Sequence, residues 1–203
     1  MLWLLFTWSV FGFAGPPLTF DRVQANVMAE TLVRGDVYVA ALDAYTTSDP
    51  QRGDVVLYYA RADNRTIHID RVVGLPGDKI QMINGVVYIN GAAVPRVPDG
   101  FHLMKDALGD EVKAQRYRET LPEGLSYDTL KFEENVFDNT ALFEVPPGNY
   151  FVLGDNRDNS TDSRIPSRGY ISRERVIGRV GTILCSVDRD AGEWRGGFLR
   201  PVR

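Results

Sequence analysis

Cysteine and histidine are nearly missing from this chain of 203 residues. The one cysteine, Cys185, lies in the apolar run VGTILCSV, so a disulfide within the chain and a cysteine zinc site are both excluded. We expect Cys185 to be a small core residue. The two histidines, His68 and His102, show no spacing to a second ligand, and we interpret them as surface or hydrogen-bonded strand residues. With no phosphate loop or dinucleotide fingerprint either, we expect neither a metal nor a cofactor.

A basic stripe is also missing. The net charge is -4, and the lysines and arginines are scattered along the chain, which excludes a nucleic-acid surface. The composition is otherwise ordinary, with 44% hydrophobic and 25% charged residues. A chain of this length and composition is expected to form one main globular domain.

Charge is absent from the N-terminal run MLWLLFTWSVFGFA, which is followed by the helix breaker GPP. A helix over residues 1–14 would rise only about 21 Å, short of a bilayer crossing. The run has no basic flank and no A-x-A cleavage pattern, which disfavours a removable signal peptide. We expect residues 1–18 to be a membrane-associated or partly spanning segment, with a buried core helix as the alternative. No Lys or Arg precedes Arg22, so the positive-inside rule does not orient the segment.

β-strand patterns fill most of the chain beyond Leu18. Two Asn-Gly pairs, Asn84-Gly85 and Asn90-Gly91, predict tight type I′ turns between antiparallel strands. Residues 96–144 lose the alternation of apolar and polar residues, so we expect an inserted, more irregular subdomain there, between two parts of a β domain at 19–95 and 145–203. The fold class is therefore mainly β. The runs rich in Val, Ile and Tyr that predict the longer strands are 37–42, 54–60, 67–74 and 175–187.

The stretch FVLGDNRDNSTDSR, residues 151–164, begins with three apolar residues and continues with a run rich in Gly, Asp, Asn, Arg and Ser. Alone it would indicate a structural turn whose side chains bond to its own backbone. Four other blocks accompany it in a fixed order: TLVRGD at 31–36, RGDVV at 52–56, DRVVGLPGDKI at 70–80 and RYRETLP at 116–122.

Together these blocks resemble bacterial signal peptidase I, the membrane-bound endopeptidase that removes signal peptides from exported proteins. The resemblance runs from Thr31 to Val180. It implies a β-rich domain that lies against the membrane surface outside the cytoplasm of a bacterium. It also implies a Ser/Lys dyad, in which burial lowers the pKa of the lysine so that it can deprotonate the serine.

The family's nucleophile block, similar to S-G-S-M-x-P-T-L, corresponds here to QANVMAETL at 24–32. Aligned on Met28, the serine nucleophile falls on Val27, which has no atom that can attack a carbonyl. The serine whose hydroxyl binds the oxyanion falls on Ala25, and the proline falls on Glu30. No serine occurs between Ser9 and Ser48, so no small shift restores the hydroxyl.

The base block, similar to K-R-V-V-G-L-P-G-D, corresponds to DRVVGLPGD, and the lysine falls on Asp70. The preceding run RADNRTIHI contains no lysine. Other positions of the family motif are kept, and the resemblance implies that Ser160 stands where a serine orients the lysine and that the acidic and arginine positions brace the turn. These kept positions are Arg71, Gly154, Asp155, Ser160, Asp162 and Arg164.

Three functions fit this pattern. The first is a non-catalytic relative that keeps the fold, with or without a peptide groove, and acts near the membrane. The second is a peptidase that uses Asp70 as general base on water or on Ser160. The third is a purely structural remnant with the groove filled. We interpret Asp70 primarily as an ion-paired or hydrogen-bonded replacement for the lysine, with Arg71 as a candidate neutralising partner.

The expected partners are the membrane and either signal-peptide-like extended peptides or a protein of the export machinery. A bound peptide is expected to lie beside a sheet edge, with small side chains in shallow apolar pockets.

Overall fold

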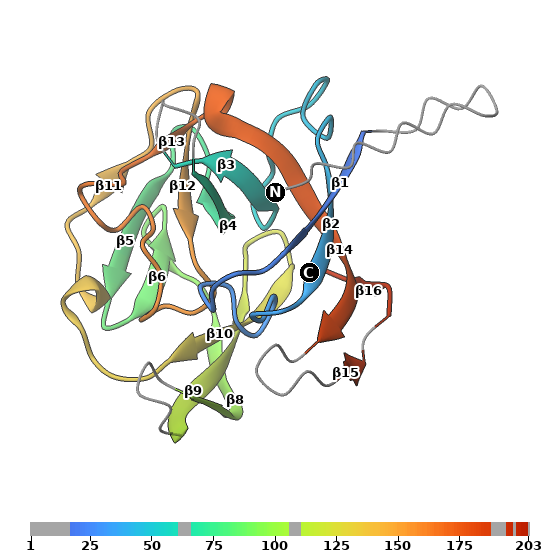
Figure 1. Cartoon of the computed structure of the whole chain (residues 1–203). Coiled ribbons are helices and arrows are strands. Elements are labelled where there is room, and N and C mark those ends of the chain that lie inside the picture. Colours follow the sequence, from blue (N-terminus) through green and yellow to red (C-terminus); the bar gives the residue numbers. More distant parts are fainter. Residues whose placement is uncertain (1–16, 61–65, 106–110, 188–193, 197, 203) are drawn as a thin grey trace.

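The computed structural model is an antiparallel β protein, as the sequence predicts (Figure 1). It describes residues 17–60, 66–105, 111–187, 194–196 and 198–202. The apolar run at 1–16, and with it nearly all of the expected membrane segment, lies outside the described residues. Within the described residues, no helix is long and apolar enough to cross a membrane.

The main sheet has nine strands, and its central order is β1-β2-β14-β3-β4-β12-β13, with β15 and β16 paired to β14. Figure 1 shows β14 as a long orange band running from the top of the molecule down beside β2. The four long predicted strands are confirmed as β2, β3, β4 and β14. The bounds are β1 Leu18–Arg22, β2 Val37–Ala41, β3 Val55–Tyr59, β4 Ile67–Gly74, β12 Asn149–Leu153, β13 Ile171–Ser172, β14 Val176–Val187, β15 Trp194–Gly196 and β16 Arg200–Pro201.

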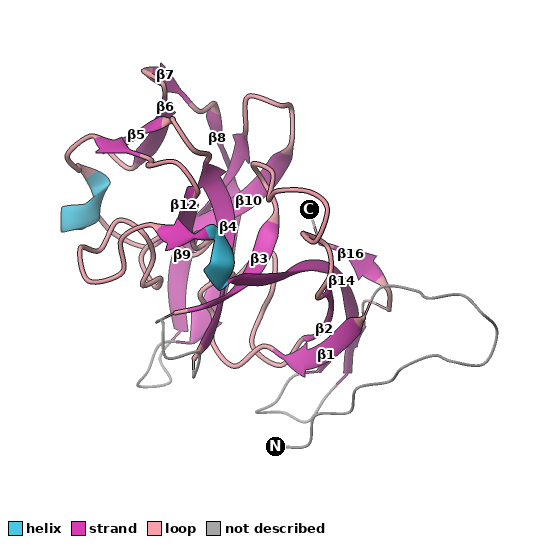
Figure 2. Cartoon of the chain, turned by 90° about the horizontal axis from the view of Figure 1, so that it is seen from above, coloured by secondary structure: helices cyan, strands magenta, loops and turns pink. Residues whose placement is uncertain are grey.

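A four-stranded sheet of order β11-β5-β6-β7 lies at one end of the molecule, away from β1, β2 and β16 (Figure 2). Both Asn-Gly pairs close hairpins in it, with φ of 49° and 73° at Asn84 and Gly85 and 53° and 82° at Asn90 and Gly91. Positive φ at both central residues is what a type I′ turn requires, so this prediction is confirmed. The bounds are β5 Lys79–Ile83, β6 Val86–Ile89, β7 Ala92–Ala93 and β11 Phe143–Glu144.

The segment expected to be irregular contains a three-stranded sheet of order β10-β9-β8, followed by a short 3-10 helix, η1. The strands were not visible in the sequence because polar side chains occupy much of both faces, so the apolar alternation is weak. A bulge between Pro98 and Phe101 breaks the alternation further. The bounds are β8 Arg96–Lys105, β9 Glu111–Thr120, β10 Ser126–Lys131, η1 Val136–Asp138 and, after β13, a second 3-10 helix η2 Arg173–Arg175.

The core holds the loop at 23–33 against the main sheet. Met28 and Leu32 are buried in one apolar cluster with side chains of β2, β3 and β14. Cys185, expected in the core, is only half-buried. A bulge between Ile183 and Cys185 shifts the register of β14, so Cys185 does not follow Ile183 into the core.

Candidate functional site

The loop at 23–33 places Val27 against the turn at 154–164. The backbone N–H of Asn156 donates to the carbonyl oxygen of Val27 at 3.0 Å, and Asn156 Nδ2 donates to the carbonyl of Asn26 at 3.0 Å. Burial of Met28 fixes the next turn of the loop. The two sequence blocks therefore meet, and the position that the resemblance assigns to a serine nucleophile carries an isopropyl group.

Asp70 lies beneath this junction on β4 and is only 2% exposed. Its carboxylate accepts a hydrogen bond from the hydroxyl of Tyr58 at 2.6 Å and one from Ser160 Oγ at 3.4 Å. Of the two roles expected for Asp70, ion-paired or hydrogen-bonded, its contacts fit the hydrogen-bonded one. Tyr58 was missed by the sequence analysis. The pairing of β3 with β4 would have revealed it. Tyr58 is paired with His68, and His68 and Asp70 lie on the same face of β4 because they are two residues apart.

Burial raises the pKa of the Asp70 carboxyl to about 8, and the nearby carboxylate of Asp162 adds to the increase. The hydrogen bond from Tyr58 acts in the opposite direction and does not cancel burial. At neutral pH the Asp70 side chain is therefore mainly protonated and uncharged.

Arg71 follows Asp70 in the chain, but successive side chains of a strand point to opposite faces of the sheet. Arg71 is fully buried, and its Nε and Nη2 donate to the two oxygens of Asp155 at 2.9 Å and 2.7 Å. Its Nη1 donates to the carbonyl of Gly53 at 2.8 Å, and its guanidinium lies 4.1 Å from the ring centre of Tyr127. The geometry makes Asp155 the ion-pair partner of Arg71, so the sequence-based suggestion that Arg71 neutralises Asp70 is not supported.

A second buried ion pair closes the turn on itself. Arg164 donates from Nε and Nη2 to the two oxygens of Asp162 at 2.9 Å and 2.8 Å, and the N–H of Gly154 donates to Asp162 at 3.2 Å. A Cβ at Gly154 would lie 2.3 Å from Ser160 Oγ and 2.8 Å from the Val27 carbonyl oxygen. Glycine is therefore the residue that lets Val27 and Ser160 approach each other.

The turn is also tied to β9 by a buried pair that the sequence analysis missed. Arg157 donates from Nη1 and Nη2 to the two oxygens of Glu119 at 2.9 Å and 2.6 Å. Both residues belong to blocks of the resemblance, RYRETLP and the turn. Both side chains are almost completely buried.

A cavity of about 240 Å³ opens beside Val27. Ala25 lines it, and the absence of a hydroxyl there leaves this wall apolar. His68 is another lining residue, and burial lowers its pKa to about 4, with Arg168 and Arg175 contributing, so its imidazole is uncharged at neutral pH. The lining residues are Asp21, Arg22, Val23, Gln24, Ala25, Val27, Met28, Leu32, Tyr38, Ile67, His68 and Ile69.

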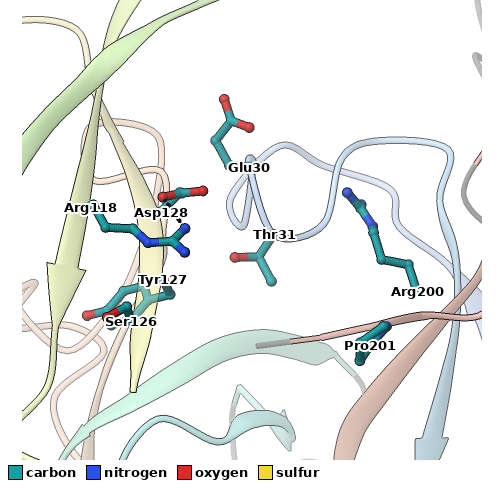
Figure 3. Close-up of a pocket in the computed structure, with 8 residues that line it drawn as sticks. All are labelled: Glu30, Thr31, Arg118, Ser126, Tyr127, Asp128, Arg200 and Pro201. Carbon is teal, nitrogen blue, oxygen red and sulfur yellow. Dashed lines mark hydrogen bonds and ion pairs between the residues drawn. The ribbon is translucent and has the colours of Figure 1, made fainter. Parts of the chain in front are cut away.

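A second cavity, of about 310 Å³, lies on another side of the same loop (Figure 3). Figure 3 shows Glu30 and Thr31 of the loop between Arg118 and Asp128 on one side and Arg200 on the other. Its lining carries charges of both signs, from Glu30 and Asp128 and from Arg118 and Arg200. No cluster of side chains suited to hold a metal ion occurs in the described part of the chain.

Comparison with known proteins points to one family. Residues 2–185 match the family model described as "Signal peptidase, peptidase S26". Curated relatives include signal peptidase I of Rickettsia typhi, 38% identical, and of Rickettsia prowazekii, 37% identical, each in an alignment 156 residues long that covers 71% of this chain. The chain spans little more than half the length of these relatives, 57%.

Among solved structures, a signal peptidase I from Enterococcus faecalis aligns with 25% identity and a TM-score of 0.37, covering 65% of this chain and 97% of that one. The match of the family model over most of the chain, together with the identity to the Rickettsia enzymes, shows that this chain belongs to the signal peptidase family, peptidase S26.

Proposed function

We propose that this protein is a signal peptidase I-like binding protein that holds extended peptides without cleaving them by Ser/Lys chemistry. The observation that carries the proposal is that one turn, at 154–164, contacts both substituted positions. Asn156 of this turn bonds to Val27 and Ser160 bonds to Asp70, which supports the assignment of Val27 and Asp70 to the two positions of the dyad.

The groups that are missing are the three that Ser/Lys catalysis needs: a nucleophile, an oxyanion donor and a base. Val27 offers no nucleophile, and Ala25 offers no hydroxyl to an oxyanion. Asp70 is mainly protonated at neutral pH, so it is a poor base under the conditions in which a depressed-pKa lysine is a good one. Three parts of one mechanism are absent together.

Peptide binding is supported by the cavity beside Val27. Its apolar walls are formed by the loop around Ala25 and by Ile67 and Ile69 of β4. An extended peptide laid between these segments would place small side chains in it. An open cavity also argues against the structural-remnant interpretation, which requires a filled groove.

We infer the partners and the location from the family. The protein would act at a bacterial inner membrane, with the β domain on the extracytoplasmic side. It would bind signal-peptide-like segments or a protein of the export machinery.

A second candidate is a peptidase that uses Asp70 and Ser160, and the 3.4 Å contact between them favours it. Ser160 Oγ would attack the scissile carbonyl carbon while its proton passes to ionised Asp70. Asp70 would then return the proton to the leaving amine nitrogen, and water would hydrolyse the acyl-serine. Because this step needs the carboxylate, cleavage would increase as the pH rises through about 8.

The deciding experiment is cleavage of a signal-peptide-bearing precursor by the purified chain in detergent, measured from about pH 6 to about pH 10, which brackets the pKa of Asp70. We expect no cleavage by the wild-type protein, and slow cleavage by the double variant Val27→Ser with Asp70→Lys. Adding Ala25→Ser should raise the rate of that variant by roughly a hundredfold or more, since it restores an oxyanion donor. Val27→Ala with Asp70→Asn is the matched inactive control.

Cleavage by the wild type that disappears in both Asp70→Asn and Ser160→Ala would establish the second candidate instead. Binding is measured separately, by the fluorescence anisotropy of a labelled peptide that carries an Ala-x-Ala segment. The absence of binding to a folded wild-type protein would overturn the proposed function.

A further inference from the structure

The loop that carries Val27 is held from two sides. On one side, Asn156 of the turn at 154–164 bonds to the carbonyls of Asn26 and Val27. On the other side lies the three-stranded sheet β8-β9-β10. This second support belongs to the segment that the sequence suggested was irregular.

The contact with the three-stranded sheet begins at Ala29. It is 1% exposed and packs in a small apolar cluster with Ala114 of β9 and Leu130 of β10. In the register of the hairpin, Ala114 is opposite His102 of β8. Directly paired residues project from the same face of a sheet, so His102 lies on the face that the loop covers.

Glu30, the next residue of the loop, meets His102. Its Oε1 lies 2.6 Å from His102 Nδ1, and both side chains are mostly buried, with 18% and 28% exposed. The contact with His102 lowers the pKa of the Glu30 carboxyl, more than offsetting the increase due to burial. Glu30 is therefore ionised at neutral pH.

The other charges around this contact have separate roles. Arg116 of β9 and Arg200 of β16 add positive potential at Glu30. Arg116 is 3.7 Å from Asp99, and Arg200 is 3.9 Å from Asp36. Across the cavity of Figure 3, Arg118 pairs with Asp128 at 2.8 Å. The side chain in direct contact with the Glu30 carboxylate is that of His102.

The loop residues on either side of this anchor line the peptide cavity: Val27 and Met28 before it and Leu32 after it. We propose that Glu30 and His102 are positioning residues, through which the inserted three-stranded sheet fixes the Val27–Met28 wall of the groove. The inference rests on the proposed peptide binding. It adds that the affinity for the peptide depends on the Glu30–His102 pair and on the sheet β8-β9-β10. In this family member, a glutamate stands at the position of the motif proline and a strand of the insertion supplies its partner.

The test is a double-mutant cycle on the full chain with Glu30→Ala, His102→Ala and both together. Binding of the labelled Ala-x-Ala peptide is measured by anisotropy, with the melting temperature recorded for each variant. We expect each single change to weaken binding about threefold to tenfold, and the double variant to bind no more weakly than the poorer single variant. Arg118→Gln is the matched control on the same face of the sheet and should stay within about twofold of wild type.

Amide hydrogen exchange at residues 27–32 gives a readout that does not need the peptide. Faster exchange there in both single variants, without a change at β5 and β6, is expected from a positioning role. If the wild type binds the peptide and both single variants bind equally well, the positioning role is overturned and peptide binding stands. If the wild type binds no peptide, the proposed function fails, and unchanged exchange at 27–32 would then overturn the positioning role as well.

Discussion

Arg71 and Asp70 are adjacent in β4 and lie on opposite faces of the strand, and they differ in charge and in their partners. On one face Arg71 is charged, fully buried and bound through two nitrogens to Asp155. On the other face Asp70 is equally buried but mainly uncharged, and its contacts are hydroxyl groups of Tyr58 and Ser160. The charged pair links β4 to the turn at 154–164, whereas the neutral side chain of Asp70 is held by hydroxyl groups.

This difference in charge shows which substitutions each of the two positions tolerates. Removing one partner of a buried ion pair leaves the other charge unsatisfied, which is costly, so Arg71 and Asp155 are kept together. The lysine position is constrained differently. Burial favours the neutral form of a lysine by lowering its pKa and the neutral form of an aspartate by raising it. A lysine and an aspartate therefore leave the site with the same net charge at neutral pH, although only the lysine is a base there.

The largest effect is expected on the charged face. Asp155→Ala should lower the free energy of unfolding by about 3 to 5 kcal/mol, because Arg71 would remain buried without its carboxylate. Urea denaturation followed by tryptophan fluorescence measures this loss. Glu144→Ala is the control, since its ion pair with Lys79 is exposed, and should change stability by less than about 0.5 kcal/mol. A similar, small effect for both variants would remove the distinction between the two faces.

Asp70→Asn should stabilise the protein increasingly as the pH rises. Between the unfolded pKa near 4 and the folded value of about 8, the folded state holds a proton that the unfolded state has released, so the stability of the wild type falls with rising pH. Asparagine has no such proton. We expect the advantage of the variant to grow by about 2 kcal/mol or more from about pH 5 to about pH 9 in thermal melts. Parallel curves would show that Asp70 is ionised in the folded protein.

Gly154→Ala tests the close packing of Val27 and Ser160 around Gly154. The added methyl would overlap Ser160 Oγ and the Val27 carbonyl, and one of these is backbone, so we expect a loss of about 1 to 3 kcal/mol. Gly181→Ala is a matched control in β14, where a Cβ meets no atom within 4 Å. Equal melting temperatures for the two variants would contradict the close approach of Val27 and Ser160.

The smallest effect is expected from Tyr58→Phe, about 1 kcal/mol, because it removes one of the hydroxyl donors to Asp70. The loss should move the titration of Asp70 to higher pH, since the hydrogen bond from Tyr58 lowers this pKa. The inflection of stability against pH reports the shift. A shift to lower pH would show that protonated Asp70 donates to Tyr58.

The strands and turns could be predicted because their signals are local. The Val- and Ile-rich runs became β2, β3, β4 and β14, and the Asn-Gly pairs adopt the positive φ that their turns require. These predictions need only the residues themselves and their neighbours in the chain. The grouping of Val27, Asp70 and Ser160 came from the family resemblance and not from local pattern.

What could not be predicted depends on pairing between distant strands. The ion pair of Arg157 with Glu119 and the contact of Glu30 with His102 each join segments that are far apart in sequence. The strands of the insertion were missed because their faces are mixed, and because a bulge in β8 breaks the alternation. Tyr58 was missed because its role appears only when β3 is paired with β4.

The place of β14 in the main sheet bears on how the protein is made. This strand lies between β2 and β3, so residues 176–187 separate two strands that are synthesised more than a hundred residues earlier. Neither β2 nor the Val27 loop packed beside it can reach its final place until the C-terminal part of the chain arrives. Such distant pairing slows folding. A nascent chain emerging from a ribosome or a translocation channel would therefore complete the main sheet, and the cavity beside Val27, only after β14 is released.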